Sequence, residues 1–176
     1  DQGQRSSDKR FVSLHQAFMA PDLPAAQAAV LAGSDGVHAM TDLSDGLYVD
    51  LPRMLSASAV YATVALESMP VSDALSAYVA EVGGDASEWA LMGGEDYALL
   101  LSCDAAAFEG IQDALRARGL PKLHVLGQVT ASADGADLAK EPVPRVCYRR
   151  AGQVWQPDAG SPKPFMHFPS VDSSAE

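Results

Sequence analysis

The sequence is short of basic residues: it has 12 Lys and Arg against 23 Asp and Glu, which gives a formal charge of −11. Proteins that bind nucleic acid or anionic lipid need cationic groups that displace counterions from phosphates, so this balance argues against both kinds of partner. A polyanionic ligand would bind this chain only with the help of a cation. Clustered Asp and Glu side chains supply the hard oxygen ligands that Mg²⁺ prefers.

Long hydrophobic runs and a cysteine framework are also missing. No segment approaches the roughly 20 apolar residues of a membrane helix, and the first residues lack the basic and then apolar order of a signal peptide. The only cysteines, Cys103 and Cys147, lie far apart and outside any metal-ligand spacing, which argues against a disulfide framework and a zinc site. We therefore expect a soluble, cytoplasmic protein that does not bind a membrane.

The composition is that of one globular domain. Of the 176 residues, 48% are hydrophobic and 20% are charged, which suffices for one well-packed core. The patterning predicts helices at residues 24–31, 47–55, 72–82, 86–92 and 105–118, and strands at 37–41, 61–66, 97–102, 123–129 and 145–150. Ala151 and Gly152 form the turn of a hairpin, which requires an antiparallel pair. The prediction is an α+β fold with a mixed, largely antiparallel sheet and helices packed on it.

Residues 1–10 are polar and carry no hydrophobic period, and residues 170–176 have the composition of a solvated tail. We expect residues 1–19 to form a linker or a frayed start and residues 169–176 to form a disordered tail. Residues 20–168 then make up the folded domain.

The first segment that carries chemistry is Thr41-Asp42-Leu43-Ser44-Asp45-Gly46-Leu47, between a predicted strand and a predicted helix. The first N–H groups of a helix have no partner within it and can receive phosphate oxygens; Ser44 adds a hydroxyl, and Gly46 lacks the Cβ that would block close approach. Asp42 and Asp45 would repel a phosphate unless a cation lay between them, so the segment predicts a metal-bridged phosphate. The alternative is that Ser44 or Asp45 is only the helix N-cap.

A second acidic turn, Gly93-Gly94-Glu95-Asp96-Tyr97, runs directly into a predicted strand. Its glycines permit an unusual turn that would carry Glu95 at the entrance to that strand. No Lys or Arg neighbours Glu95 and Asp96 in the sequence, so an external cation or a cationic ligand would compensate their charge. The alternative is an exposed turn with solvated acids.

Both segments, in this order and at this separation, resemble the two signature stretches in the C-terminal half of thiamine-monophosphate kinase, a family of the aminoimidazole ribonucleotide synthetase superfamily. The stretches are Asp42-Leu43-Ser44-Asp45-Gly46-Leu47 followed by Asp50-Leu51, Ala90-Leu91-Met92-Gly93-Gly94-Glu95-Asp96-Tyr97 followed by Leu99-Leu100, and, near the end of the chain, Pro164-Phe165-Met166-His167-Phe168. The resemblance covers residues 20–168. It implies that they form a C-terminal catalytic-half domain with the fold of that superfamily.

The resemblance implies transfer of the γ-phosphoryl group of ATP to thiamine phosphate, which gives thiamine diphosphate, with Mg²⁺ as cofactor. The family's pattern matches five site positions in this sequence. They are Asp42 and Asp45 as Mg²⁺ ligands, Ser44 as a contact of the nucleotide phosphates, and Glu95 and Phe165 as contacts of thiamine phosphate. Asp50 and Asp96 also match and would support the site. The resemblance assigns no catalytic residue.

Members of this family carry an N-terminal domain with its own Asp-rich metal motifs and a dimer-forming sheet, and residues 1–20 supply none of those acids. The resemblance therefore implies that the chain is the C-terminal part of a longer, homodimeric enzyme and has little or no activity alone. Two alternatives stay open. One is another enzyme of the superfamily, of the selenophosphate synthetase or hydrogenase maturation type. The other is a non-catalytic module that binds a metal or a nucleotide.

Overall fold

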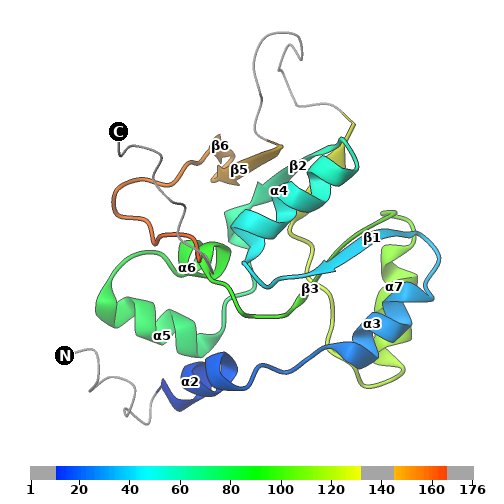
Figure 1. The fold of residues 1–176 in the computed structure, drawn as a ribbon, viewed down its shortest axis with the longest axis horizontal. Helices are drawn as coiled ribbons and strands as arrows, with labels where there is room; N and C mark the ends of the chain where they lie inside the picture. The colour runs from blue at the N-terminus through cyan, green and yellow to red at the C-terminus, as the bar shows by residue number, and fades with distance from the viewer. Residues whose placement is uncertain (1–10, 132–144, 166–176) are drawn as a thin grey trace, which may run out of the picture.

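The computed structural model describes residues 11–131 and 145–165. The helices are α2 (Val12–Met19), α3 (Ala25–Ala32), α4 (Leu47–Ala57), α5 (Asp73–Val82), α6 (Ala86–Met92) and α7 (Phe108–Arg116), with a short 3-10 helix, η2 (Leu66–Ser68). The strands are β1 (Val37–Asp42), β2 (Tyr61–Ala65), β3 (Leu99–Cys103), β4 (Gly127–Thr130), β5 (Val146–Arg150) and β6 (Gln153–Val154). Figure 1 shows their arrangement.

The strands form two sheets. β1 and β3 pair antiparallel, and the other strands form a sheet in the order β4-β2-β5-β6, in which β2 and β5 are parallel and the remaining neighbours antiparallel. The predicted α+β fold with mixed, largely antiparallel pairing is confirmed, although the strands are divided between two sheets. α4 contacts both β1 and β2 and so connects the two sheets (Figure 1).

Two hydrophobic clusters hold these elements together. In the larger cluster, Leu47, Leu51 and Leu55 of α4 pack with residues of β2, β5 and α6. Their spacing of four residues places them on one face of the helix, as the sequence predicts. In the smaller cluster, Leu31 of α3 packs with Ile111 and Leu115 of α7 beneath β1 and β3. The first acidic segment leads into α4 and the second follows α6, so both acidic segments adjoin the larger cluster.

Several segments differ from the prediction or lie outside the described residues. Of the strand predicted at 123–129, only residues 127–129 lie in β4. Helix α2 forms inside residues 1–19, where we expected a linker. None of the α2 residues is buried. Phe11, which precedes the helix, packs edge-on against Tyr78 of α5, with ring centres 5.4 Å apart. Residues 132–144 and the expected tail at 169–176 lie outside the described residues.

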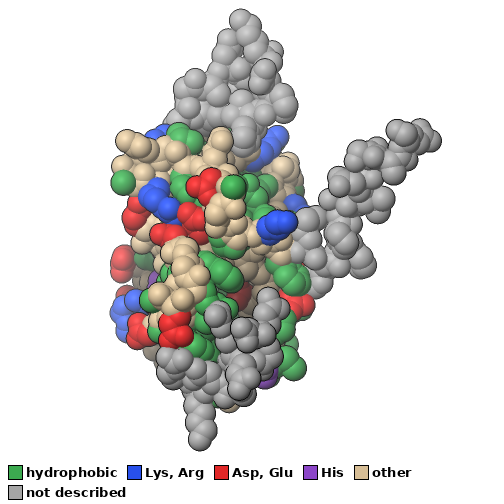
Figure 2. All heavy atoms as spheres, turned by 90° about the vertical axis from the view of Figure 1, so that its left-hand side faces the viewer, with side chains coloured by type: hydrophobic (Ala, Val, Ile, Leu, Met, Phe, Trp, Pro, Cys, Tyr) green, Lys and Arg blue, Asp and Glu red, His purple; other side chains and the backbone are tan. Residues whose placement is uncertain are grey.

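No helix among the described residues is long and apolar enough to cross a membrane. On the face shown in Figure 2, Lys and Arg side chains stand among Asp and Glu and do not form a continuous basic patch.

Candidate functional site

The two acidic segments lie side by side. At the end of β1, Asp42 is opposite Leu99 at the start of β3, and three backbone hydrogen bonds continue the pairing beyond the strands. They run from Leu43 N to Ala98 O (2.9 Å), from Tyr97 N to Leu43 O (3.0 Å) and from Glu95 N to Ser44 O (2.8 Å). Segments about 50 residues apart in the sequence are thus joined as one ladder, as a single site requires.

Gly46 lies directly against the second segment. It adopts φ 91° and ψ 163°, and a Cβ built on it would lie 1.8 Å from the carbonyl oxygen of Gly93. No other residue fits, because this backbone region is restricted to glycine and the neighbouring carbonyl fills the space of a side chain. The glycine that the sequence suggests for approach to a phosphate is thus also required for contact between the two segments.

Asp50 and Arg53 hold the chain in place at the start of α4. Gly46 is the N-cap and makes no side-chain cap bond, so the alternative that Ser44 or Asp45 caps the helix is wrong. Instead, Asp50 in the first turn accepts a hydrogen bond from the Asp45 N–H at 2.9 Å. Arg53 donates to the carboxylates of both Asp45 and Asp50, and the bond to Asp45 raises the pKa of the Arg53 guanidinium.

The two predicted metal ligands therefore differ. The Asp45 side chain is 17% exposed and is engaged by Arg53. Asp42 is exposed, and no Lys or Arg within the described ranges pairs with it; it lines a shallow hollow of about 230 Å³ together with Tyr97 and Leu99. The described part of the chain contains no group of three or more Asp, Glu, His or Cys side chains that could hold a metal ion. Asp42 is thus the accessible carboxylate, and metal binding by Asp42 and Asp45 stays a prediction.

The second segment is a strained turn. Glu95 has φ 63° and Tyr97 has φ 50°, a region that residues other than glycine rarely adopt and that costs on the order of 1–3 kcal/mol for each residue. The backbone bonds to Leu43 and Ser44 hold this turn in place. Within residues 11–131 and 145–165, Glu95 and Asp96 form no ion pair with Lys or Arg. Desolvation raises the pKa of the Asp96 carboxyl, although the residue as a whole is exposed.

Phe165 joins the site from the far end of the described chain. Its N–H donates to Met92 O at 3.0 Å, and its ring lies over Gly94: a Cβ built on Gly94 would be 2.5 Å from Phe165 Cδ1. Phe165 is therefore a near neighbour of Glu95, the other predicted contact of thiamine phosphate. Residues 166–168, the remainder of the matching stretch, lie outside the described residues.

The sequence analysis missed Arg53. A signal was present, because Asp50 and Arg53 are three residues apart on a predicted helix and residues at that spacing face each other. The contact of Arg53 with Asp45 has no such signal, since it depends on how the chain enters the helix.

The family model described as "AIR synthase related protein, C-terminal domain" matches residues 1–138. The chain belongs to this family. Thiamine-monophosphate kinase from Salmonella typhimurium is 34% identical to it over 110 residues, which are 62% of this chain and 33% of that protein. The resemblance to thiamine-monophosphate kinases is thereby confirmed, and the chain spans about a third of the length of this curated relative.

Two solved structures share the fold of this chain. AaThiL complexed with AMPPCP and TMP has a TM-score of 0.67 and 23% identity, over 95% of this chain and 45% of that chain. The hydrogenase maturation protein HypE from E. coli has a TM-score of 0.58 and 20% identity, over 81% of this chain and 41% of that chain. At these identities the likeness establishes the C-terminal domain fold and does not distinguish between the two activities.

Proposed function

We propose that this domain is one half of the active site of an ATP- and Mg²⁺-dependent kinase that phosphorylates thiamine phosphate to thiamine diphosphate. The supporting observation is the hydrogen-bonded ladder that joins Leu43 and Ser44 to Glu95 and Tyr97. It sets the predicted phosphate-binding segment beside the predicted substrate segment. The named activity of the Salmonella relative and the AMPPCP, an ATP analogue, in the AaThiL complex support the same assignment.

The first segment is suited to phosphates and their metal. Mg²⁺ is commonly held by one or two carboxylates together with phosphate oxygens and water, so the exposed Asp42 fits this role without a closed cage of protein ligands. When bound, Mg²⁺ would neutralise the charge that spreads over the phosphoryl oxygens during transfer. Ser44 offers a hydroxyl beside Asp42. Arg53 pairs with the Asp45 carboxylate and would compete with a metal for it.

The second segment is suited to thiamine phosphate. The thiazolium ring of this substrate is both aromatic and cationic. Glu95 contributes a carboxylate that no cation in the described part of the chain compensates, and the ring of Phe165 next to it offers a face on which a cationic ring can stack. Attraction to the carboxylate and stacking on the ring together select for charge as well as for shape.

The proposed active site needs further metal ligands besides those that the described residues supply. The described residues contain no group of three candidate metal ligands, and the chain spans about a third of the length of its Salmonella relative. We propose that further metal ligands come from the N-terminal domain that the resemblance implies, and that the full-length enzyme is a homodimer. Such an enzyme would act on soluble substrates in the cytoplasm. The 176-residue chain alone would then bind ligands weakly and turn over little or no substrate.

Calorimetric titration of the chain with Mg²⁺, AMPPCP and thiamine phosphate tests this function. We expect Asp42→Asn to weaken binding of AMPPCP with Mg²⁺ about tenfold, and Glu95→Gln to weaken thiamine phosphate to a similar degree, since each removes a charge that faces the ligand. Asp113→Asn and Glu109→Gln on the exposed side of α7 are matched controls and should change neither titration. Binding of neither ligand to the unmodified chain, or equal effects of site and control variants, would contradict the proposal.

The fold that this chain shares with HypE makes a hydrogenase maturation type of enzyme the second candidate. It predicts binding of a nucleotide without thiamine phosphate, so the same titrations separate the two candidates. The other alternative, a non-catalytic module that binds a metal or a nucleotide, likewise predicts no binding of thiamine phosphate.

Arg53→Ala provides a test of the metal-binding segment alone. Arg53 and a divalent cation would compete for the Asp45 carboxylate, so removal of the arginine is expected to tighten binding of Mn²⁺, a Mg²⁺ substitute, about threefold or more at low salt. Arg116→Ala removes a similar ion pair with Asp113 on α7 and is the control. Electron paramagnetic resonance of free Mn²⁺ measures the affinity, and an unchanged affinity in Arg53→Ala would show that Asp45 is not a metal ligand.

A further inference from the structure

The segment that carries Phe165 has no regular secondary structure of its own. Residues 155–165 follow β6 and are attached to the domain at three points along their length. These attachments are Trp155 N to Tyr148 O (2.8 Å), Ser161 Oγ to Glu88 Oε2 (2.7 Å) and Phe165 N to Met92 O (3.0 Å). Since the last two both end on α6, this helix decides where the segment lies.

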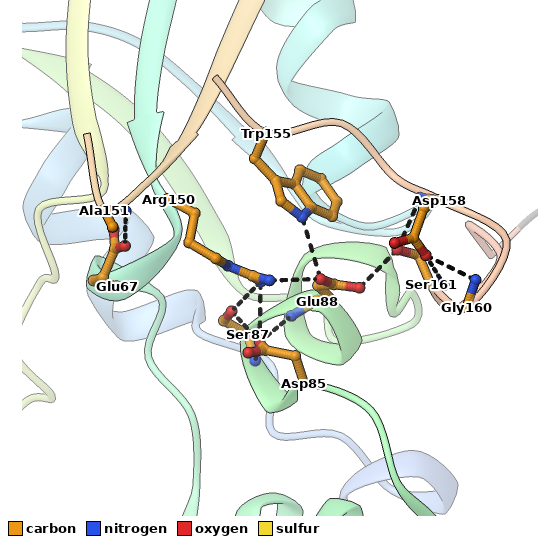
Figure 3. A network of polar contacts seen from close by, with 10 residues as sticks. All are labelled: Glu67, Asp85, Ser87, Glu88, Arg150, Ala151, Trp155, Asp158, Gly160 and Ser161. Carbon is orange, nitrogen blue, oxygen red and sulfur yellow. Dashed lines mark hydrogen bonds and ion pairs between the residues drawn. The ribbon is translucent and has the colours of Figure 1, made fainter. Parts of the chain in front are cut away.

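Glu88 is the centre of this attachment. It is only 8% exposed, and three donors from different parts of the chain converge on its carboxylate (Figure 3). Arg150 Nη1 and Trp155 Nε1 donate to Oε1 at 2.8 and 3.2 Å, and Ser161 Oγ donates to Oε2 at 2.7 Å. A buried carboxylate is unfavourable unless such donors satisfy it, so loss of its charge would weaken all three contacts together.

Arg150 extends the network to the start of α6. Its guanidinium also lies 3.2 Å from Asp85 Oδ1, and it lies over the ring of Trp155, 5.6 Å from the ring centre. Asp85 in turn caps α6 by accepting hydrogen bonds from the N–H groups of Ser87 and Glu88. The network thus fastens the end of β5 and the segment 155–165 to the first turn of α6 (Figure 3).

The other end of α6 leads straight into the site. α6 ends at Met92, whose carbonyl receives the Phe165 N–H, and Gly93 and Gly94 follow. One short helix therefore holds the segment through Glu88 at its start and presents the surface for Phe165 at its end. The position of Phe165 over Gly94 depends on both.

We infer that Glu88 is a positioning residue for the substrate half of the site: it fastens residues 155–165 to α6 and so keeps Phe165 over Gly94 and beside Glu95. The inference deepens the proposed function and rests on it for the identity of the ligand, thiamine phosphate. Glu88 acts through Phe165 and does not touch the substrate.

The first part of the test measures the segment without any ligand. Glu88→Gln keeps the side-chain volume but removes the charge that pairs with Arg150 and replaces one acceptor oxygen by an amide N–H₂. Ser161→Ala removes a single donor in case the first variant folds poorly. We expect exchange of the Phe165 amide hydrogen to accelerate at least tenfold in Glu88→Gln and less in Ser161→Ala. In a Trp89→Phe background Trp155 is the sole tryptophan, and its emission should shift to the red. Exchange in α7 should change less than twofold, and Glu109→Gln on α7 is the matched control.

The second part measures binding. Glu88→Gln should weaken thiamine phosphate five- to twentyfold and change the affinity for AMPPCP with Mg²⁺ less than twofold. Unchanged exchange at Phe165 in both variants, or equal acceleration in α7, would overturn the positioning role. If the unmodified chain binds no thiamine phosphate, the proposed function fails and the substrate role of Glu88 fails with it, whereas the exchange data still decide whether Glu88 holds the segment.

Discussion

Replacement of Gly46 by alanine is expected to destabilise the domain by about 3 kcal/mol or more, because two unfavourable terms act at one position. The backbone of Gly46, at φ 91° and ψ 163°, lies where a residue with a Cβ is strained. The new Cβ would also lie 1.8 Å from Gly93 O, a backbone atom that cannot rotate away. Relief requires the two acidic segments to separate, so the loss of stability should come with a loss of ligand binding. Urea unfolding followed by circular dichroism measures the first effect.

Gly110→Ala is the matched control for this prediction. Gly110 lies within α7, and a Cβ built on it meets nothing within 4 Å. Alanine is the better helix former, so this variant should be stabilised by about 0.5–1 kcal/mol. If Gly46→Ala were as stable as the unmodified chain, the close contact between the two segments would not exist in solution.

Replacement of Gly94 by alanine is expected to weaken thiamine phosphate about tenfold or more, since tenfold corresponds to only about 1.4 kcal/mol and overpacking costs about 1–3 kcal/mol. Gly94 does not adopt a positive φ, and the nearest conflict is with Phe165: the new Cβ would lie 2.5 Å from Cδ1, 2.7 Å from Cγ and 2.8 Å from Cβ of that residue. Contact with the Phe165 Cβ means that a change of rotamer is not sufficient. The whole residue must move off Gly94. Calorimetric titration measures the effect.

A double-mutant cycle separates this mechanism from general damage. Phe165→Ala alone should weaken thiamine phosphate, because the stacking surface is lost. With the stacking ring already absent, displacement of residue 165 through its remaining Cβ removes no further contact with the ligand, so the double variant should bind about as weakly as Phe165→Ala. Additive losses in the double variant would mean that Gly94 acts by another route, and the assignment of Phe165 would lose its support.

Much of the fold could be predicted because its signals are local. Helix α5 begins after Ser72, whose hydroxyl accepts a hydrogen bond from Leu75 N, and ends at Gly83 with φ 89°. The hairpin turn at Ala151 and Gly152 has positive φ at both residues, as a tight turn between twisted strands requires. Caps and turns of this kind depend on a few neighbouring residues, so the sequence is sufficient to place them.

Features that depend on distant parts of the chain could not be predicted. β3 begins at Leu99 rather than at Tyr97, because Tyr97 has φ 50° and its N–H donates to Leu43 O in the first acidic segment. Nothing in the sequence around Glu88 indicates that three donors will contact its carboxylate, since all three lie more than 60 residues away. The two acidic segments were predicted from composition and motif. Their adjacency became visible only in the pairing of β1 with β3.

The most direct test of a single shared site is paramagnetic broadening of backbone amide signals by Mn²⁺. Mn²⁺ and AMPPCP would be added to the ¹⁵N-labelled chain in substoichiometric amounts, with Asp42→Asn as the control. We predict that the signals of residues 43–46 and 94–97 broaden together, that those of α7 do not, and that the broadening is lost in Asp42→Asn. Broadening confined to one segment, or centred elsewhere on the domain, would contradict a site shared by both segments.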